Sequence, residues 1–202
     1  MTSARYTPIA LVAAVVCASA VPSACGSTAL SKPEEHNRLE IVSFSAAEQE
    51  AAAMQLPSCE VDGIETSEWT VRTFPPYFRV LLPADFTVQD DVPDLQQLWV
   101  APDGSLFLVT QHEGDGRVTT GLGFDEPAEM AEEAACRIMV GGRTAALYQY
   151  VAHLRGQTYF CASLDAGLRE GLGIGVAILA ASAPRRAELI AAIRTISIAD
   201  VE

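Results

Sequence analysis

The strongest constraint on the fold lies in residues 136–198, where long β-forming runs are followed by one amphipathic helical pattern. Gly141 and Gly142 separate two apolar runs, and such a linker suits a tight hairpin because both residues can adopt positive φ. The apolar run 172–180 contains glycines at its second and fourth positions, which favours a strand with crowding on one side. Three or four antiparallel strands are therefore expected here, joined by a polar connection at 165–171.

The helical pattern closes the chain. Ser182 suits an N-cap position, and Pro184 falls in the first turn, where its missing N–H costs nothing. Apolar residues then recur on one stripe, with charged residues elsewhere. The residues of this stripe are Leu189, Ile190, Ile193 and Ile196. A helix that covers the apolar side of the strands is the prediction, and the fold class is α+β, an antiparallel β meander covered by helices.

Earlier segments add shorter elements to this plan. Asp103-Gly104 between apolar runs is a strong hairpin signal, and Ser45-x-x-Glu48 has the form of a capping box. The expected strands are 69–74, 77–82, 95–101 and 106–111, and the expected helices are 45–55 and a short acidic one at 127–135.

The start of the chain has the pattern of an export signal. Arg5 precedes an apolar segment at 9–21 that is short for a membrane span. Ala24-Cys25 resembles the lipobox of bacterial lipoproteins, in which the cysteine becomes the lipidated first residue. Pro22 departs from that pattern, and ordinary cleavage after Ala20 or Ala24 is the alternative.

Three regions are therefore expected. Residues 1–24 form a signal peptide of lipoprotein type, 25–56 form a tether with a possible N-terminal helix, and 57–202 form a single α+β domain. Either form of cleavage gives an exported protein, in the periplasm or on the outer cell surface. Lipidation would make the membrane a partner through the anchor on Cys25.

The charge of the chain excludes some partners. Residues 1–24 contain one of the 13 Lys and Arg residues and none of the 26 Asp and Glu residues, so the chain from Cys25 onward has a net charge of −14. Such a surface repels phosphate backbones and anionic lipid, so we expect no nucleic-acid partner.

Three cysteines remain for a disulfide in an exported domain. In the predicted hairpins Cys136 falls opposite Leu147, and Cys161 falls opposite Tyr150, which places the two cysteines on opposite sides of the middle strand. A disulfide has too short a reach to cross that strand. The favoured bridge is Cys59–Cys136, with Cys161 as a buried free thiol, and a Cys59–Cys161 bridge is the second possibility.

The order of these elements resembles the PsbP-like fold, an α/β/α sandwich found in photosystem extrinsic proteins and many bacterial lipoproteins. The resemblance covers residues 70–199. It rests on a strand ending at 82–86, a Trp-bearing hairpin at 99–111, the Gly-Gly turn at 140–145 and the closing segment 186–198. The resemblance implies an interaction module and supplies no catalytic residues.

Familiar catalytic motifs are missing from the sequence. It has no G-x-S-x-G, no H-E-x-x-H, no C-x-x-C and no Walker-type phosphate loop. The glycine-rich run 171–175 lacks the dinucleotide-binding context, so we interpret it as strand packing. No cofactor is expected.

Two histidines could take part in chemistry. His112 sits beside Glu113, with Asp115 and Asp125 near in sequence, and such a set could hold a divalent cation. The calcium-loop spacing is absent, so a solvated acidic loop is the favoured interpretation and no metal site is predicted. His153 is expected to point outward from a strand, although a serine triad can assemble from distant positions.

Three hypotheses follow for the function. The first is an exported, lipid-anchored, non-catalytic module that binds an envelope protein or a small ligand. The second is an envelope hydrolase that uses His112 or His153. The third is a carrier of a small apolar ligand, which needs a void lined by Leu147, Ile178 and Ile193.

Overall fold

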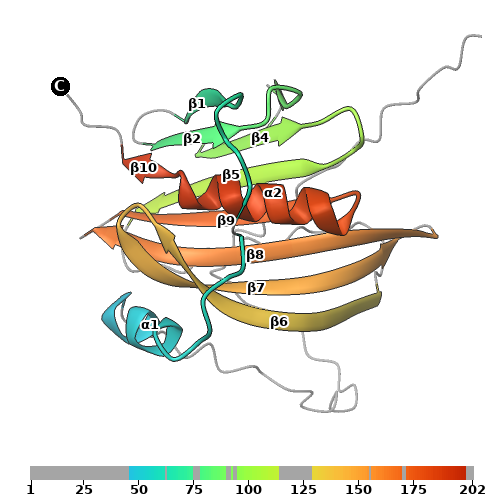
Figure 1. Cartoon of the computed structure of the whole chain (residues 1–202). Helices are drawn as coiled ribbons and strands as arrows, with labels where there is room; N and C mark the ends of the chain where they lie inside the picture. Colours follow the sequence, from blue (N-terminus) through green and yellow to red (C-terminus); the bar gives the residue numbers. More distant parts are fainter. Residues whose placement is uncertain are drawn as a thin grey trace, which may run out of the picture.

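The computed structural model describes most of the domain that follows the predicted tether (Figure 1). The described residues are 46–198 except 62, 75–77, 90–91, 93–94, 114–128, 155 and 170–171. Cys25 and the predicted signal peptide lie outside them, as do Asp115 and Asp125. Among the described residues, no helix has the length and hydrophobicity needed to cross a bilayer.

The described elements are mostly strands, with one helix before the first strand and one before the last. In chain order they are α1 (Ala46–Ala53), β1 (Thr70–Phe74), β2 (Phe78–Leu82), β3 (Thr87–Gln89), β4 (Gln96–Val100), β5 (Leu106–Glu113), β6 (Glu129–Val140), β7 (Arg143–Leu154), β8 (Gln157–Arg169), β9 (Leu172–Ala180), α2 (Ala183–Arg194) and β10 (Ser197–Ile198).

Two antiparallel sheets account for the described strands. The larger has the order β3-β4-β5-β9-β8-β7-β6, and the smaller has the order β1-β2-β10. Strands β6 to β9 form a meander of long hairpins, and β5 joins the free edge of β9 along its whole length. Helix α2 crosses one face of the large sheet, with the small sheet beside it (Figure 1). The predicted α+β class with an antiparallel sheet is confirmed.

The hairpin turns follow the glycine chemistry. Gly141 and Gly142 have φ angles of +55° and +82°, which glycine adopts without a steric cost. The turn places Cys136 opposite Leu147, as predicted from the two-residue linker. In the β4–β5 hairpin Gly104 likewise has a φ of +85°.

Helix α2 begins and packs as its sequence indicates. The Ser182 side chain accepts a hydrogen bond from the Arg185 amide, and Pro184 lies in the first turn. The predicted apolar stripe is buried in the main hydrophobic cluster together with side chains of both sheets. The helix therefore closes the core rather than presenting an apolar face to a partner.

Two predictions about the local structure were wrong. Residues 127–135 were expected to form a short helix, but β6 begins at Glu129 and pairs with β7 through an irregularity between Glu132 and Ala134. Pairing along a 12-residue edge outweighs the modest helix preference of Ala and Glu. The expected loop at 165–171 is also mostly strand, because β8 continues to Arg169 opposite β9.

The entry of the chain into the domain is fixed to the edge of β6. Cys59 donates its amide hydrogen to the Arg137 carbonyl, and the Arg137 amide bonds to the Pro57 carbonyl. The structure contains the Cys59–Cys136 disulfide that the sequence favoured, with a Cα–Cα distance of 5.0 Å. Cys161 is a buried free thiol, and burial raises its pKa to about 12.

Candidate functional site

Strand β9 separates two different environments. Its apolar side chains Ile174, Val176 and Ile178 belong to the main cluster beneath α2. Side chains alternate along a strand, so Gly173, Gly175 and Ala177 lie on the opposite face. On that face β9 contributes little side-chain volume at Gly173 and Gly175, whereas its end carries Leu179, which packs with Leu106 and Cys161.

His112 on β5 occupies part of this space. Its Cα is the register partner of Gly173, and a Cβ atom at Gly173 would overlap the imidazole ring. His112 Nε2 lies 2.9 Å from Asp165 Oδ1 on β8. The contact thus spans β9 and joins β5 to β8 above a glycine.

Polar atoms without partners gather beside this pair. Among the described residues, six buried side-chain atoms have no hydrogen-bond partner, and four of them belong to β4 or β5. The six are Arg72 Nε, Gln96 Oε1, Thr110 Oγ1, Gln111 Oε1, His112 Nδ1 and Arg185 Nε. Of these, Arg185 Nε is compensated by an ion pair with Asp103 Oδ2 at 3.5 Å. A buried polar group without a partner costs about 1–3 kcal/mol, so a concentration of such groups calls for an explanation.

Three of these atoms share the face of the sheet that carries Asp165. The register places Gln96 opposite Thr110, Thr110 opposite Gly175 and Gly175 opposite Asp165. Thr110 is 4% exposed and His112 is 9% exposed. We call the set of Gln96, Thr110, His112 and Asp165, with the two glycines of β9 between them, the His112 site.

The chemistry of the His112 site follows from its hydrogen bonds. The Nε2 atom of His112 faces a carboxylate oxygen, so it carries the hydrogen and donates it. In the neutral ring Nδ1 is then an acceptor. His112 Nδ1 has no hydrogen-bond partner among the described residues. These residues also contain no group of three or more His, Cys, Asp or Glu side chains able to hold a metal ion.

The sequence singled out His112, but the favoured interpretation of a solvated loop is wrong, because His112 lies in β5 and is buried. The sequence associated the ring with Asp115 and Asp125, which lie outside the described residues, whereas Asp165 supplies the carboxylate. Sequence distance hid Asp165, since it lies 53 residues from His112. The glycines of the run 172–180 were the available signal, because crowding above them was predicted and the crowding group is the imidazole.

The other histidine and the proposed apolar void have simpler environments. His153 is exposed on β7, as expected, and its Nδ1 lies 3.0 Å from the Thr158 hydroxyl. Leu147, Ile178 and Ile193 are fully buried in one hydrophobic cluster. These three side chains pack into the core.

A cavity of about 260 Å³ lies elsewhere, next to the disulfide. Its lining combines methionine side chains with two arginines, but it contains none of the buried polar atoms that lack partners. The lining residues are Met54, Ser58, Cys59, Arg137, Ile138, Met139, Thr144 and Arg194. The His112 site therefore carries the stronger indication of a ligand.

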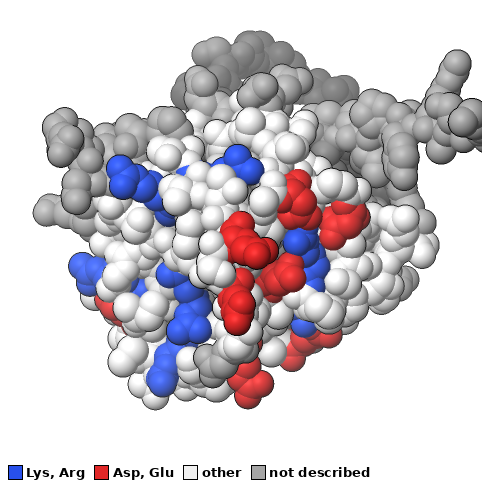
Figure 2. All heavy atoms as spheres, turned by 45° about the horizontal axis from the view of Figure 1, so that its top comes forward, with Lys and Arg blue, Asp and Glu red and all other residues white. Residues whose placement is uncertain are grey.

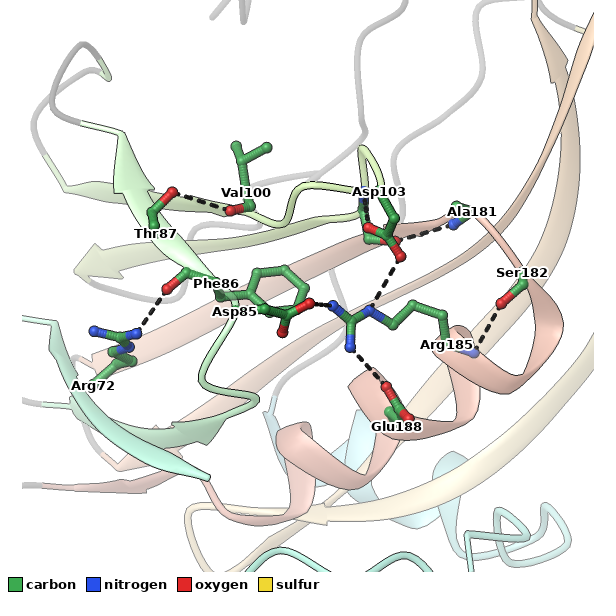
Figure 3. A network of polar contacts seen from close by, with 11 residues as sticks. Arg72, Asp85, Phe86, Thr87, Val100, Asp103, Ala181, Ser182, Arg185 and Glu188 are labelled. Carbon is green, nitrogen blue, oxygen red and sulfur yellow. Dashed lines mark hydrogen bonds and ion pairs between the residues drawn. The ribbon is translucent and has the colours of Figure 1, made fainter. Parts of the chain in front are cut away.

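Charged side chains near the start of α2 form a network of their own (Figure 3). The Arg185 guanidinium forms ion pairs with Asp85 and Glu188 and lies 4.8 Å from the centre of the Phe86 ring. Burial lowers the pKa of Arg185, but its bonds to Glu188 and Asp85 outweigh burial and raise it. The guanidinium stays charged and holds the helix against the β2–β3 connection.

The surface above this network is mixed in charge. In Figure 2 acidic side chains gather in the middle of the face around basic ones, and further basic side chains lie at its left side. Arg186 pairs with Glu133 in the same way that Arg185 pairs with its carboxylates. Both arginines at the start of α2 are thus paired with carboxylates.

No protein-family model matches the chain, and no curated protein matches it in sequence. A protein of known structure from Bacteroides thetaiotaomicron VPI-5482 is similar with a TM-score of 0.48 and 15% identity, over 66% of this chain and 49% of that one. Cyanobacterial PsbP (CyanoP) from Synechocystis sp. PCC 6803 is similar with a TM-score of 0.47 and 11% identity, over 72% of this chain and 99% of that one.

This chain therefore spans about half the length of the Bacteroides protein. With both TM-scores below 0.5, neither similarity establishes a family, a function or a partner for the chain.

Proposed function

We propose that the protein is exported, is anchored through a lipid on Cys25 and acts in the cell envelope as a non-catalytic binding module. The leader pattern of residues 1–24 and the Ala24-Cys25 pair support export and anchoring. The Cys59–Cys136 disulfide is compatible with this location, because disulfides persist in oxidising compartments.

The single observation that carries the binding role is the set of buried, unpartnered polar atoms at the His112 site. Folded proteins pair nearly all of their buried polar groups, and the exceptions often serve a function. A small ligand that bonded to these atoms would offset the cost of burying them. The site therefore favours a small ligand over an envelope protein as the binding partner.

The finer architecture is also part of this proposal. We propose that the domain is a PsbP-like α/β/α sandwich, with α2 as one helical layer. The order of the meander and the closing helix supports this assignment. An experimental structure of residues 25–202 tests it, and a structure with both faces of the sheet covered by strands would contradict it.

The anchor is testable by metabolic labelling. In a bacterial host that lipidates exported proteins, we expect radiolabelled palmitate to enter the wild-type chain and not the Cys25→Ser variant. The matched control is Cys161→Ser, which removes another cysteine but leaves the labelling unchanged. Absence of label in the wild type would contradict the anchor.

The binding role is testable by examining what the protein retains. The chain is purified from its own envelope fraction under mild conditions and denatured, and the released small molecules are identified by mass spectrometry. We expect a compound that wild type and a Thr158→Val control retain and that Thr110→Val loses. Equal release from all three proteins would contradict binding at the His112 site.

One observation supports the alternative function, an envelope hydrolase. Asp165 orients the imidazole of His112, as the carboxylate of a hydrolase orients its general base. A screen of ester and peptide substrates tests this alternative with His112→Ala and His153→Ala. The hydrolase is removed if the wild type shows no turnover, or if both variants keep the wild-type rate.

A further inference from the structure

We propose that the His112 site binds a small molecule that carries a primary ammonium group. The proposal rests on the proposed binding role of this site and names the class of its ligand. It draws on the hydrogen-bonding character of the site, on its charge and on the glycines of β9 that separate its polar residues.

The unpartnered atoms of the site are mainly acceptors. Gln96 Oε1 is an acceptor, and His112 Nδ1 is one in the neutral ring because Nε2 donates to Asp165. The Thr110 hydroxyl can accept as well. A ligand that satisfies this set must bring several N–H or O–H donors, and an ammonium group brings three.

The charge of the site distinguishes an ammonium from a neutral polyol. Asp165 engages His112 through Oδ1, and its side chain is 27% exposed, so it still reaches solvent. No arginine forms an ion pair with Asp165 among the described residues. A cation would pair with this carboxylate, and the net charge of −14 from Cys25 onward attracts cations over a longer range.

A glycine separates two polar side chains of the site. Thr110 and Asp165 lie in one row on either side of Gly175, so two strand spacings of about 4.8 Å separate their backbones. Gly175 contributes no side chain to the gap. A compact ammonium suits hydrogen bonds to both sides of this gap, whereas a planar guanidinium favours paired acceptors in one plane.

Calorimetric titration of residues 25–202 with Cys25→Ser tests the proposal with three probes. Ethylammonium chloride carries charge and N–H donors, ethanol carries a donor without charge, and tetramethylammonium chloride carries charge without a donor. We expect saturable binding of ethylammonium alone. Saturable binding of ethanol or tetramethylammonium with equal affinity, or no binding of ethylammonium, would overturn the proposal.

Variants locate the binding. In Thr110→Val and Asp165→Asn, we expect the affinity for ethylammonium to fall at least about tenfold, which corresponds to the loss of one hydrogen bond to a charged group. Glu65→Gln removes one exposed carboxylate and should leave the affinity unchanged. Equal affinity in all variants would show that ethylammonium does not bind at the His112 site. If Asp165→Asn fails to fold, Thr110→Val still provides this test.

The two proposals fail separately. If ethylammonium does not bind, yet wild type retains a compound from the envelope that Thr110→Val loses, the binding role stands and the ammonium class is wrong. If no compound is retained and no probe binds, both are wrong.

Discussion

The two faces of β9 differ in what their residues do. On one face Ile174, Val176 and Ile178 pack beneath α2. On the other face Gly173 and Gly175 lie between a histidine and a threonine of β5 and an aspartate of β8, and the His112 ring covers Gly173. Burial of large apolar side chains stabilises a fold in proportion to the area removed from water. Glycines beside buried, unpartnered polar atoms give no such stability.

The contrast between the two faces of β9 separates residues that stabilise the fold from residues that we associate with binding. The face beneath α2 contains the larger of the two hydrophobic clusters. The opposite face keeps polar atoms whose bonding is incomplete among the described residues, and natural proteins accept such costs mainly at functional sites. Substitutions on the two faces should therefore have different consequences for stability and for binding.

The largest loss of stability is expected from a substitution on the face beneath α2. Phe107 is fully buried and packs edge-on against Trp99. Phe107→Ala should lower the free energy of unfolding by about 4 kcal/mol, because it leaves a cavity in the core. Urea unfolding followed by tryptophan fluorescence measures the change. A loss smaller than about 1 kcal/mol would show that this face does not dominate the stability.

A smaller loss is expected where the opposite face is crowded. Gly173→Ala places a methyl group where the His112 ring lies, so the ring must move away from Asp165. Overpacking of this kind costs about 2 kcal/mol. Chemical denaturation gives the stability, and the NMR signals of the His112 ring nitrogens report the broken hydrogen bond. An unchanged His112 spectrum would contradict the contact.

A smaller loss of stability is expected at the start of α2, which lies away from the His112 site. The Ser182 side chain bonds to the Arg185 amide at 3.3 Å. Ser182→Ala should cost about 1 kcal/mol, the usual value of an N-cap, with no effect on ligand binding. Thermal unfolding checks the first part. Weakened binding in this variant would show that the helix and the His112 site are coupled.

The smallest effect concerns Cys161, which lies on the same face as the His112 site. Burial raises its pKa to about 12 from 9.0, so the thiol is protonated in both the folded and unfolded chain at pH 7. Its contribution to stability is present below pH 9 and is lost as the pH rises toward 12. Iodoacetamide at pH 8 should leave the folded protein unmodified and alkylate the unfolded one. Rapid alkylation of the folded chain would show that the thiol is accessible.

Much of the fold could be predicted from the sequence because its turns and its helix cap depend on residues adjacent in the chain. The Gly141-Gly142 turn, the Asp103-Gly104 turn and the cap at Ser182 are each fixed by a few adjacent residues. Strand β6 was missed at its start because Ala and Glu favour a helix locally. Its partner β7 decides the outcome, and that pairing depends on residues that are distant in sequence.

The candidate site was predicted only in part for the same reason. His112 was singled out by its residue type, and the crowding above Gly173 by glycine in an apolar run. Asp165 and Thr110 become its neighbours only through the order β5-β9-β8, which inserts a distant strand between them. A sequence pattern cannot show that order, because β5 pairs with the last strand of the meander and not with the next one.

Two adjacent residues on opposite faces provide the most direct measurement. Val109 is buried in the core and Thr110 is buried at the His112 site, and valine and threonine have nearly the same shape. Without ligand, Val109→Thr should destabilise the protein by about 1–3 kcal/mol, because it buries a hydroxyl among apolar groups. Thr110→Val should leave the free energy of unfolding unchanged or raise it. Equal destabilisation by both substitutions would show that the Thr110 hydroxyl is bonded in the folded chain, and would contradict the His112 site.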